Sequence, residues 1–261
     1  MTAQWNPEQY LRYAQERERP FWELVARVHG RSPATVVDLG CGPGTATAAL
    51  LPRWPQARIH GIDSSAAMIE QASAHAQPPQ LTFELQDIRS WQAPSGSVDL
   101  LLSNAALHWV PGHLDLFERW LASLAADGRF AFQVPRNFDQ PSHTLLARLA
   151  TSPEWAGKLG GVSRALDLPS VGEYHERLHA LGATVDIWET TYHQVLSGSD
   201  PVLEWVRGTA LRPYLAALDG DDAAAFDSGY AAALRDAYPR LASGETLFPF
   251  TRLFVVATRT G

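Results

Sequence analysis

The sequence predicts an α/β protein with a doubly wound, mostly parallel sheet that carries helices on both faces. Two observations predict this class. Short apolar runs alternate with helix-length segments over the first 134 residues, which is the pattern of a parallel sheet covered by crossover helices. In addition, a glycine-rich segment at 38–44 follows the first apolar run, and Asp63 ends the second, as in nucleotide-binding α/β sheets.

The first half of the chain contains five strand-length runs bounded by Gly, Pro, Ser or Asp, which are typical turn residues. They cover residues 34–39, 57–63, 81–86, 98–103 and 129–134. Helices are expected between several of them, over 45–53, 66–76 and 113–125. Apolar residues at helical spacing also predict helices over 5–29, and Pro20 is expected to divide them into two pieces.

The second half is less regular, and residues 135–168 show no clear period. The expected elements after it are a helix at 171–181 ended by Gly182, a strand at 184–195, helices at 200–218 and 221–237, and a last strand at 252–258. The first of the two later helices is expected to be interrupted near Leu211–Pro213.

No linker composition divides the chain, so we expect a single domain over 1–261. In this interpretation, three segments form a helical lid over a ligand site: the N-terminal helices at 5–29 and two insertions at 136–170 and 197–245.

The composition narrows the class of protein. The chain has 261 residues, 46% of them hydrophobic and 19% charged, with a formal charge of −7, which is typical of a soluble globular protein and disfavours a nucleic-acid partner. No apolar run approaches the roughly 20 residues of a membrane helix. We therefore expect a cytoplasmic protein with no membrane partner, and we assume a monomer. The single Cys41 excludes an internal disulfide and a Cys-rich zinc site.

The segment Asp38-Leu39-Gly40-Cys41-Gly42-Pro43-Gly44 is the strongest local signal of a ligand. Glycines between a strand and a helix allow a tight turn and the approach of a ligand to the backbone, and Asp63 at the next strand end can accept hydrogen bonds from ribose hydroxyls. A dinucleotide fingerprint is disfavoured by Thr45 and Pro43. Asp38 would repel phosphate but can face an ammonium group, which S-adenosylmethionine carries. The alternative is a turn without a ligand.

The pattern D-x-G-x-G-x-G resembles the first motif of class I S-adenosylmethionine-dependent methyltransferases, whose fold has a seven-stranded sheet. The resemblance implies that residues at successive strand ends hold S-adenosylmethionine. They are Asp38, Gly40, Cys41, Gly42, Gly44, Asp63, Ser64, Met68, Asp87, Ile88, Asn104 and Ala105. In this pattern Asp87 faces the adenine amino group, Met68 lies near the adenine and ribose, and Asn104-Ala105 lies beneath the methionine moiety.

Further motifs along nearly the whole chain resemble the family of trans-aconitate 2-methyltransferases. They are W-N-P-x-x-Y at 5–10, E-R-x-R-P at 16–20, G-I-D-S-S-x-A-M-I at 61–69, D-I-R-x-W at 87–91, N-A-x-L-x-W at 104–109, V-D-I-W-x-T-T-Y at 185–192, W-V-x-x-T-x-L-R-P at 205–213 and R-L-F-x-V-A-T-R at 252–259. The sequence departs from the family pattern over 138–170 and at His108, where an amide side chain is expected.

The resemblance implies esterification of one carboxylate of a small tricarboxylic acid, with S-adenosylhomocysteine as the second product. Such a carboxylate is ionised at pH 7, so we expect no general base, no covalent nucleophile and no metal, and catalysis by positioning alone. A trianion needs cationic partners, and Arg suits carboxylates best. The candidate substrate residues are Arg212 first, then Arg19, Arg17, Arg252 and Arg136, with Tyr10, His108 and Trp109 in the pocket wall. The alternative for each Arg is a solvated surface charge.

Three other functions stay open at this point. The same fold can act on another small acid, or on a carbon or quinone acceptor, which usually requires a base. A dinucleotide-dependent oxidoreductase is a second alternative, and a non-catalytic cofactor-binding protein is a third. Clustering of Arg212 and Arg252 near Asn104 would favour the acidic substrate.

Overall fold

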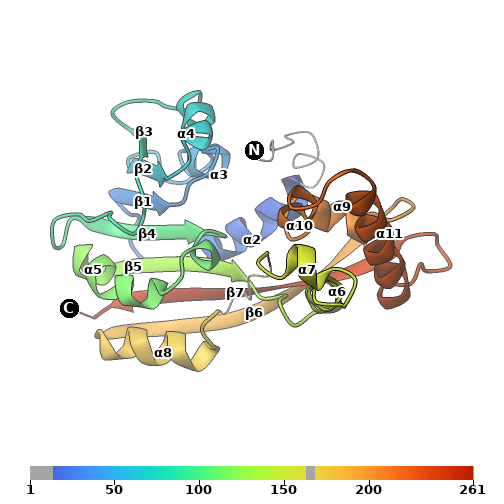
Figure 1. Ribbon diagram of the computed structural model, residues 1–261. Coiled ribbons are helices and arrows are strands. Elements are labelled where there is room, and N and C mark those ends of the chain that lie inside the picture. Colours follow the sequence, from blue (N-terminus) through green and yellow to red (C-terminus); the bar gives the residue numbers. More distant parts are fainter. Residues whose placement is uncertain (1–13, 163–167, 261) are drawn as a thin grey trace. The chain divides into compact units, whose positions relative to one another are not determined.

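The computed structural model describes residues 14–162 and 168–260, with side chains described from residue 18 onward (Figure 1). The described residues form two compact units, each treated by itself below. The sheet unit comprises residues 17–135, 168–190 and 252–260, and the helical unit comprises 14–16, 136–162 and 191–251. The helical unit thus contains most of the two insertions, 136–170 and 197–245, that the sequence analysis assigned to a lid together with the N-terminal helices.

A seven-stranded sheet, with the order β3-β2-β1-β4-β5-β7-β6, organises the fold (Figure 1). The strands are β1 (Thr35–Leu39), β2 (Arg58–Asp63), β3 (Leu81–Leu85), β4 (Val98–Asn104), β5 (Leu124–Pro135), β6 (Ala183–Leu196) and β7 (Thr246–Arg259). The first five are parallel, and β7 pairs with β5 in the antiparallel sense. This arrangement confirms the predicted doubly wound, mostly parallel α/β class.

The strand order places a topological switch point between β1 and β4. The chain runs from β1 outward through β2 to β3 and then returns to β4 on the other side of β1. The connections from β1 and β4 therefore leave on opposite faces of the sheet, and their carboxyl ends leave a crevice in which open α/β sheets bind ligands. Strand β4 lies in the middle of the sheet, and its four residues Leu100–Ser103 are buried, as in strands covered on both faces.

The helices of the sheet unit are α2 (Ala14–Ala26), α3 (Thr45–Ala48), α4 (Ala66–Ser73), α5 (Phe117–Ser123) and α8 (Val171–Ala180), with 3₁₀ turns at Leu107–Trp109 and His113–Leu116. Those of the helical unit are α6 (Pro141–Ala150), α7 (Ala156–Leu159), α9 (Pro201–Arg207), α10 (Arg212–Ala216) and α11 (Gly220–Ala237). Within the described residues, no helix is both long and apolar enough to cross a membrane.

Each unit has its own hydrophobic core. In the sheet unit, buried side chains of β4, β5 and β7 pack with α5 and α8, and Trp120 and Phe130 are among the largest of them. In the helical unit, α6, α9 and α11 contribute to a second cluster around Trp205, Phe226 and Phe248. Burial of this kind contributes roughly 25 cal/mol for each Å² of apolar surface, so the helical segments are held by packing rather than by helix propensity.

Two expectations about local structure were wrong, and one segment without a clear period contains a helix. Pro20 does not divide the N-terminal helix, because α2 continues through it and buries Phe21, Leu24 and Val25 immediately after it, and this packing offsets the missing hydrogen bond. The helix expected over 45–53 ends at Ala48 and continues only as turns. The segment 135–168 contains α6, whose period was hidden because small residues occupy its buried face.

The expected interruption near 211–213 is confirmed. Helix α9 ends at Arg207, and α10 begins at Arg212 with Pro213 in its first turn, where proline's missing N–H removes no helical hydrogen bond. The helix predicted over 171–181 is also confirmed, because α8 ends at Ala180 and Gly182 follows with a φ of 78°.

Candidate functional site

The candidate site is built at the carboxyl ends of β1, β2, β3 and β4 in the sheet unit. The glycine loop follows β1, Asp63 ends β2, Asp87 follows β3, and Asn104 ends β4. All four strands are parallel neighbours, so these ends meet at one edge of the sheet. The structure therefore brings together the polar strand-end residues that the sequence analysis grouped.

Backbone hydrogen bonds shape the glycine loop. The N–H groups of Gly40 and Cys41 both donate to the carbonyl of Ile62, each at 2.9 Å. Gly42 has a φ of 56°, and a Cβ built there would meet nothing within 4 Å. A side chain at Gly42 is thus disfavoured by the backbone conformation alone, and the space beside it is open to a ligand.

Gly44 is required for a different reason. It precedes α3 with a φ of 76°, and a Cβ there would lie 2.8 Å from both the Ala72 Cβ and the Phe83 ring. The loop is therefore pressed against α4 and β3, which lets the backbone turn tightly from β1 into α3.

The carboxylate of Asp63 is fixed by two backbone donors. The N–H of Gly42 donates to its Oδ2 at 3.0 Å, and that of Ser65 donates to its Oδ1 at 2.9 Å. Each carboxylate oxygen keeps a lone pair for a further donor, so Asp63 can still accept from hydroxyls such as those of ribose. Ser65 also caps α4, whose first turn holds the half-buried Met68, and Ser64 is exposed.

Asp38 is the buried acid of the site. It is 2% exposed, and Thr47 donates to its Oδ2 at 2.6 Å. Burial raises the pKa of Asp38 to about 6, against the effect of the Thr47 hydrogen bond, and the charge of Asp63 adds to the rise. Among the described residues, Asp38 Oδ1 has no hydrogen-bond partner. A buried acceptor in this state suits a cationic donor such as an ammonium group.

Cys41 lies buried between these acids. Burial first, and then the charges of Asp38 and Asp63, raise the pKa of its thiol. The thiol therefore stays protonated at neutral pH and is not a nucleophile.

Asp87 differs from the expectation in its partners. Its carboxylate is held by Arg89, whose Nη2 lies 2.6 Å from Oδ2 and whose backbone N–H donates to Oδ1 at 2.8 Å. The side-chain hydrogen bond from Arg89 lowers the pKa of Asp87. Ile88 next to it is buried. The contact of Asp87 with an adenine amino group stays a prediction.

A second polar group begins where β4 ends. Asn104 Oδ1 accepts from Gln133 Nε2 at 2.6 Å, and Gln133 Oε1 accepts from Arg252 Nη1 at 3.3 Å. Arg252 is 9% exposed and Gln133 is 1% exposed, so a buried cation lies on β7, two strands away from Asn104. The next residue, Ala105, has a φ of 54°, which is uncommon for a residue with a Cβ and marks a constrained turn.

His108 lies beside this cation. Burial lowers the pKa of His108 to about 3, and the charges of Arg252 and His113 add to the effect. At neutral pH the imidazole is therefore uncharged, and among the described residues its buried Nδ1 has no hydrogen-bond partner. Its ring lies 4.7 Å from that of Trp109, which is 58% exposed. Both are in a 3₁₀ turn that follows β4.

The other predicted substrate residues are not assembled by the structure. Arg19 is exposed on α2, and Tyr10 and the side chain of Arg17 lie outside the described residues. Arg136 and the half-buried Arg212 belong to the helical unit. Their part in binding an acid therefore stays a prediction, whereas Arg252 is joined to Asn104 through Gln133.

Sequence reasoning missed Gln133. Its signal was present, because Gln133 is the one polar residue in the apolar run 130–134. A lone amide in a buried strand requires hydrogen-bond partners, and its register opposite Asn104 supplies one of them.

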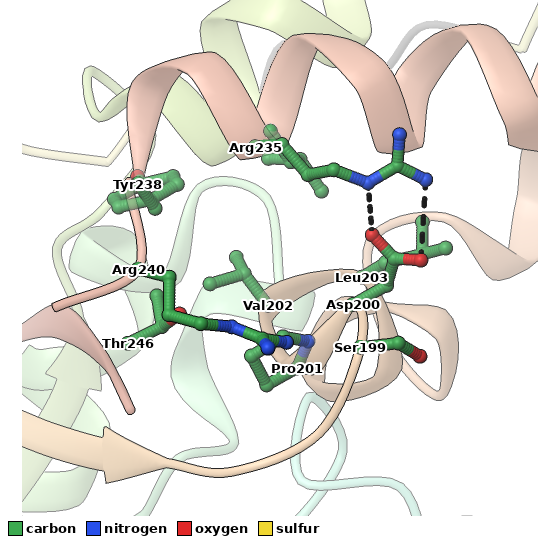
Figure 2. Close-up of a pocket in the computed structure, with 10 residues that line it drawn as sticks. Ser199, Asp200, Pro201, Val202, Leu203, Arg235, Tyr238, Arg240 and Thr246 are labelled. Carbon is green, nitrogen blue, oxygen red and sulfur yellow. Dashed lines mark hydrogen bonds and ion pairs between the residues drawn. The ribbon is translucent and has the colours of Figure 1, made fainter. Parts of the chain in front are cut away.

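The helical unit contains a separate cavity of about 250 Å³, lined by α9, the end of α11 and the start of β7. Figure 2 shows the Arg235 guanidinium facing the Asp200 carboxylate across it, at 2.6 Å. The acid that lines this cavity is thus already neutralised, and the cavity holds none of the predicted site residues. Within the described part of the chain, no cluster of three or more His, Cys, Asp or Glu side chains is arranged to hold a metal.

Known proteins share the fold of this chain. A model of the methyltransferase domain matches residues 36–128. Solved structures share the fold: the YcgJ protein from Bacillus subtilis has a TM-score of 0.59 at 17% identity and covers 94% of this chain and 99% of its own. An S-adenosylmethionine-dependent methyltransferase structure from Listeria monocytogenes, titled as putative, has a TM-score of 0.54 at 17% identity and covers 95% and 100%. The fold and the strand-end residues define a class I S-adenosylmethionine-dependent methyltransferase.

Curated relatives narrow the class to a family. Trans-aconitate 2-methyltransferase of Streptomyces avermitilis is 49% identical over 260 residues, covering 97% of this chain and 96% of the relative. The proteins of the same name from Streptomyces coelicolor and Azoarcus sp. are 52% and 45% identical and cover 98% of this chain, with 86% and 99% of their own lengths. The chain belongs to the family of trans-aconitate 2-methyltransferases.

Proposed function

We propose that this protein transfers the methyl group of S-adenosylmethionine to a carboxylate oxygen of trans-aconitate, giving the monomethyl ester and S-adenosylhomocysteine. The observation that carries the proposal beyond family membership is the buried Arg252, which hydrogen bonds through Gln133 to Asn104 at the end of β4. A cation that is buried at the ligand-binding edge of an acidic protein suits an anionic substrate.

The residues of the sheet unit fit S-adenosylmethionine. Asp38 has a buried carboxylate oxygen with no partner among the described residues, and the ammonium group of the methionine end supplies a donor for it. Asp63 would hold the ribose, and the open side of Gly42 lets a ligand approach the loop. When bound, S-adenosylmethionine supplies a methyl group that its sulfonium activates toward nucleophiles.

Catalysis by this chain then consists of binding and orienting the acid. The substrate carboxylate is ionised at neutral pH, so no group of the protein has to remove a proton from it. Arg252 attracts the anion, and the uncharged His108 can donate one hydrogen bond. Holding two reactants in line contributes roughly 7–11 kcal/mol in favourable cases, and we propose that Trp109 excludes water from the transfer.

We further propose that Arg212, Arg19, Arg17 and Tyr10 contact the acid, and that Arg136 is a weaker candidate. These assignments rest on the family motifs around W-V-x-x-T-x-L-R-P at 205–213 and W-N-P-x-x-Y at 5–10. We also propose that the protein acts in the cytoplasm. Its formal charge of −7 favours a small anion bound in a local basic pocket over a nucleic-acid partner.

Another acceptor in the same fold is the second candidate, because His108 stands where the family pattern has an amide. The protonation behaviour of His108 distinguishes a carboxylate acceptor from a carbon acceptor. A carbon acceptor usually needs a base, and a histidine with a pKa of about 3 is a weak one at neutral pH. The site therefore favours an acceptor that is already ionised.

A direct test is transfer of a labelled methyl group from S-adenosylmethionine to a panel of acids: trans-aconitate, cis-aconitate, citrate and isocitrate. We expect label in extractable ester with trans-aconitate well above the others. Transfer to another acid of the panel would keep the reaction and replace the substrate. Transfer to none of them, with S-adenosylhomocysteine still bound in calorimetry, would reject the carboxylate reaction.

A further inference from the structure

The side-chain amide of Gln133 lies between Asn104 and Arg252, near the strand ends where the candidate site is built. Gln133 pairs with Asn104 of β4 on one side and with Phe254 of β7 on the other. Residues in register, and those two positions along a neighbouring strand, share a face of a sheet, so Asn104, Gln133 and Arg252 form a row across three strands. The hydrogen bond between Arg252 and Gln133, at 3.3 Å, is buried, and the one between Gln133 and Asn104, at 2.6 Å, is partly buried.

The donor and acceptor of each hydrogen bond in this row are fixed. A guanidinium has only donors, so the Gln133 oxygen must face Arg252. The Gln133 nitrogen then faces Asn104, and Asn104 must present its oxygen to it. The NH₂ group of Asn104 is consequently turned away from Gln133 and is left to donate to another acceptor.

The backbone of Gln133 also holds the turn that follows β4 at Ala105. The N–H of Ala105 donates to the Gln133 carbonyl at 3.0 Å. Ala105 has a φ of 54°, and a residue in this region persists when its surroundings hold it there. Gln133 thus contacts the end of β4 through both its side chain and its main chain.

We propose that Gln133 is a positioning residue that holds the Arg252 guanidinium and orients the Asn104 amide as a hydrogen-bond donor, so that this row recognises ligand carboxylates. For the acid substrate, the inference rests on the proposed function. For the amino-acid carboxylate of S-adenosylmethionine and S-adenosylhomocysteine, it does not depend on which acceptor is methylated.

Two substitutions separate the parts of this role. Gln133→Met keeps the length of the side chain and removes both hydrogen bonds. Gln133→Glu keeps the acceptor for Arg252 but offers no donor to Asn104 and adds a negative charge. The Asn104 amide then turns its NH₂ group toward Glu and presents its oxygen to the ligand. Ser123→Ala is the matched control, because it removes a buried hydrogen bond, from the Ser123 hydroxyl to the Trp120 carbonyl at 2.7 Å, at the end of α5 just before β5.

The first readout is binding of S-adenosylhomocysteine and of methylthioadenosine, which lacks the amino acid, measured by calorimetry. The second is the KM for the acid, measured separately from kcat. A lost hydrogen bond to a charged group weakens binding by about ten- to a hundredfold. Weaker binding of S-adenosylhomocysteine with unchanged binding of methylthioadenosine assigns the donor to the cofactor carboxylate. A higher KM for the acid with unchanged affinity for S-adenosylhomocysteine assigns it to the substrate. Either result supports the proposal, and Gln133→Glu should show the larger effect.

A double-mutant comparison tests whether Gln133 acts through Arg252. On an Arg252→Met background, Gln133→Met should raise the KM for the acid by less than twofold, because coupled residues are non-additive. Wild-type affinities and KM in both Gln133 variants, or an equal loss of methylthioadenosine binding, would overturn the proposal. If the wild-type protein methylates none of the acids, the proposed function fails, and the comparison of S-adenosylhomocysteine with methylthioadenosine still decides the role of Gln133.

Discussion

The hydroxyl of Thr47 donates to the carboxylate of Asp38 at 2.6 Å and leaves the second oxygen of that carboxylate buried. The pKa of Asp38 is raised to about 6, mainly by burial, which shows that ionised Asp38 is held at a cost in the folded protein. A buried carboxylate that destabilises the folded protein when no ligand is bound, and that can accept from an ammonium group, is typical of a binding site rather than of a structural core.

Replacement of Asp38 by Asn should raise stability and lower cofactor affinity. The folded protein binds the Asp38 proton more tightly than the unfolded chain does, so ionised Asp38 lowers stability above pH 6, by roughly 1–3 kcal/mol. Asp38→Asn should therefore raise Tm at pH 8 and weaken binding of S-adenosylhomocysteine at least about tenfold. Asp115→Asn, at an exposed site, is the charge-matched control. A variant that loses stability and keeps full affinity would contradict this role.

Binding of S-adenosylhomocysteine should depend on pH through Asp38. Its carboxylate accepts from an ammonium only when ionised, and its pKa of about 6 places the change in the range of calorimetry. We expect affinity to fall as the pH is lowered from 7.5 to 5, approaching tenfold for each pH unit below the pKa. The dependence should be absent in Asp38→Asn, and an unaltered dependence in that variant would assign the titration to another group.

Gly42 and Gly44 should respond differently to alanine. A Cβ at Gly44 lies 2.8 Å from Ala72 and Phe83, whereas one at Gly42 meets nothing within 4 Å. Gly44→Ala should lower the free energy of unfolding by a few kcal/mol, about 1–3 from strain alone. Gly42→Ala should lower it by only about 1–2 kcal/mol and weaken S-adenosylhomocysteine binding, because the added methyl enters the open side of the loop. Urea denaturation and calorimetry measure the two effects, and similar profiles for both variants would refute the distinction.

Arg252→Met should raise the KM for the acid more than tenfold, because hydrogen bonds to charged groups contribute about 1.5–3 kcal/mol each. Its effect on the affinity for S-adenosylhomocysteine should be smaller. Arg58→Met, at an exposed position at the start of β2, controls for the change of net charge. An unchanged KM in Arg252→Met would remove Arg252 from the substrate site and leave Arg212 as the leading cation.

The doubly wound sheet and the position of the glycine loop could be predicted from the sequence because they depend on local patterns. Strand periodicity, turn glycines and an acid at a strand end are all read over a few residues, and the loop from Asp38 to Gly44 lies where they predicted. Helix α6 was missed because Ser142 and Ala150 occupy its buried face with Leu146, which weakens an apolar period.

The acid site was less predictable because it depends on pairing between distant strands. Arg252 ranked below Arg212 in the sequence, and the register of β5 with β4 and β7 joins Arg252 to Asn104 through Gln133, whereas the role of Arg212 stays a prediction. Gln133 was missed for the same reason, because its two hydrogen-bond partners, Asn104 and Arg252, come from strands that are distant in the sequence.

The most direct test of the account is identification of the product formed from trans-aconitate and ¹³C-methyl S-adenosylmethionine by NMR. The account predicts one new ¹³C signal in the range of a methyl ester, formed in equal amount with S-adenosylhomocysteine, and a much slower appearance of that signal with Arg252→Met at low acid concentration. A methyl signal bonded to carbon, or no new signal while S-adenosylhomocysteine binds normally, would contradict methyl transfer to a carboxylate.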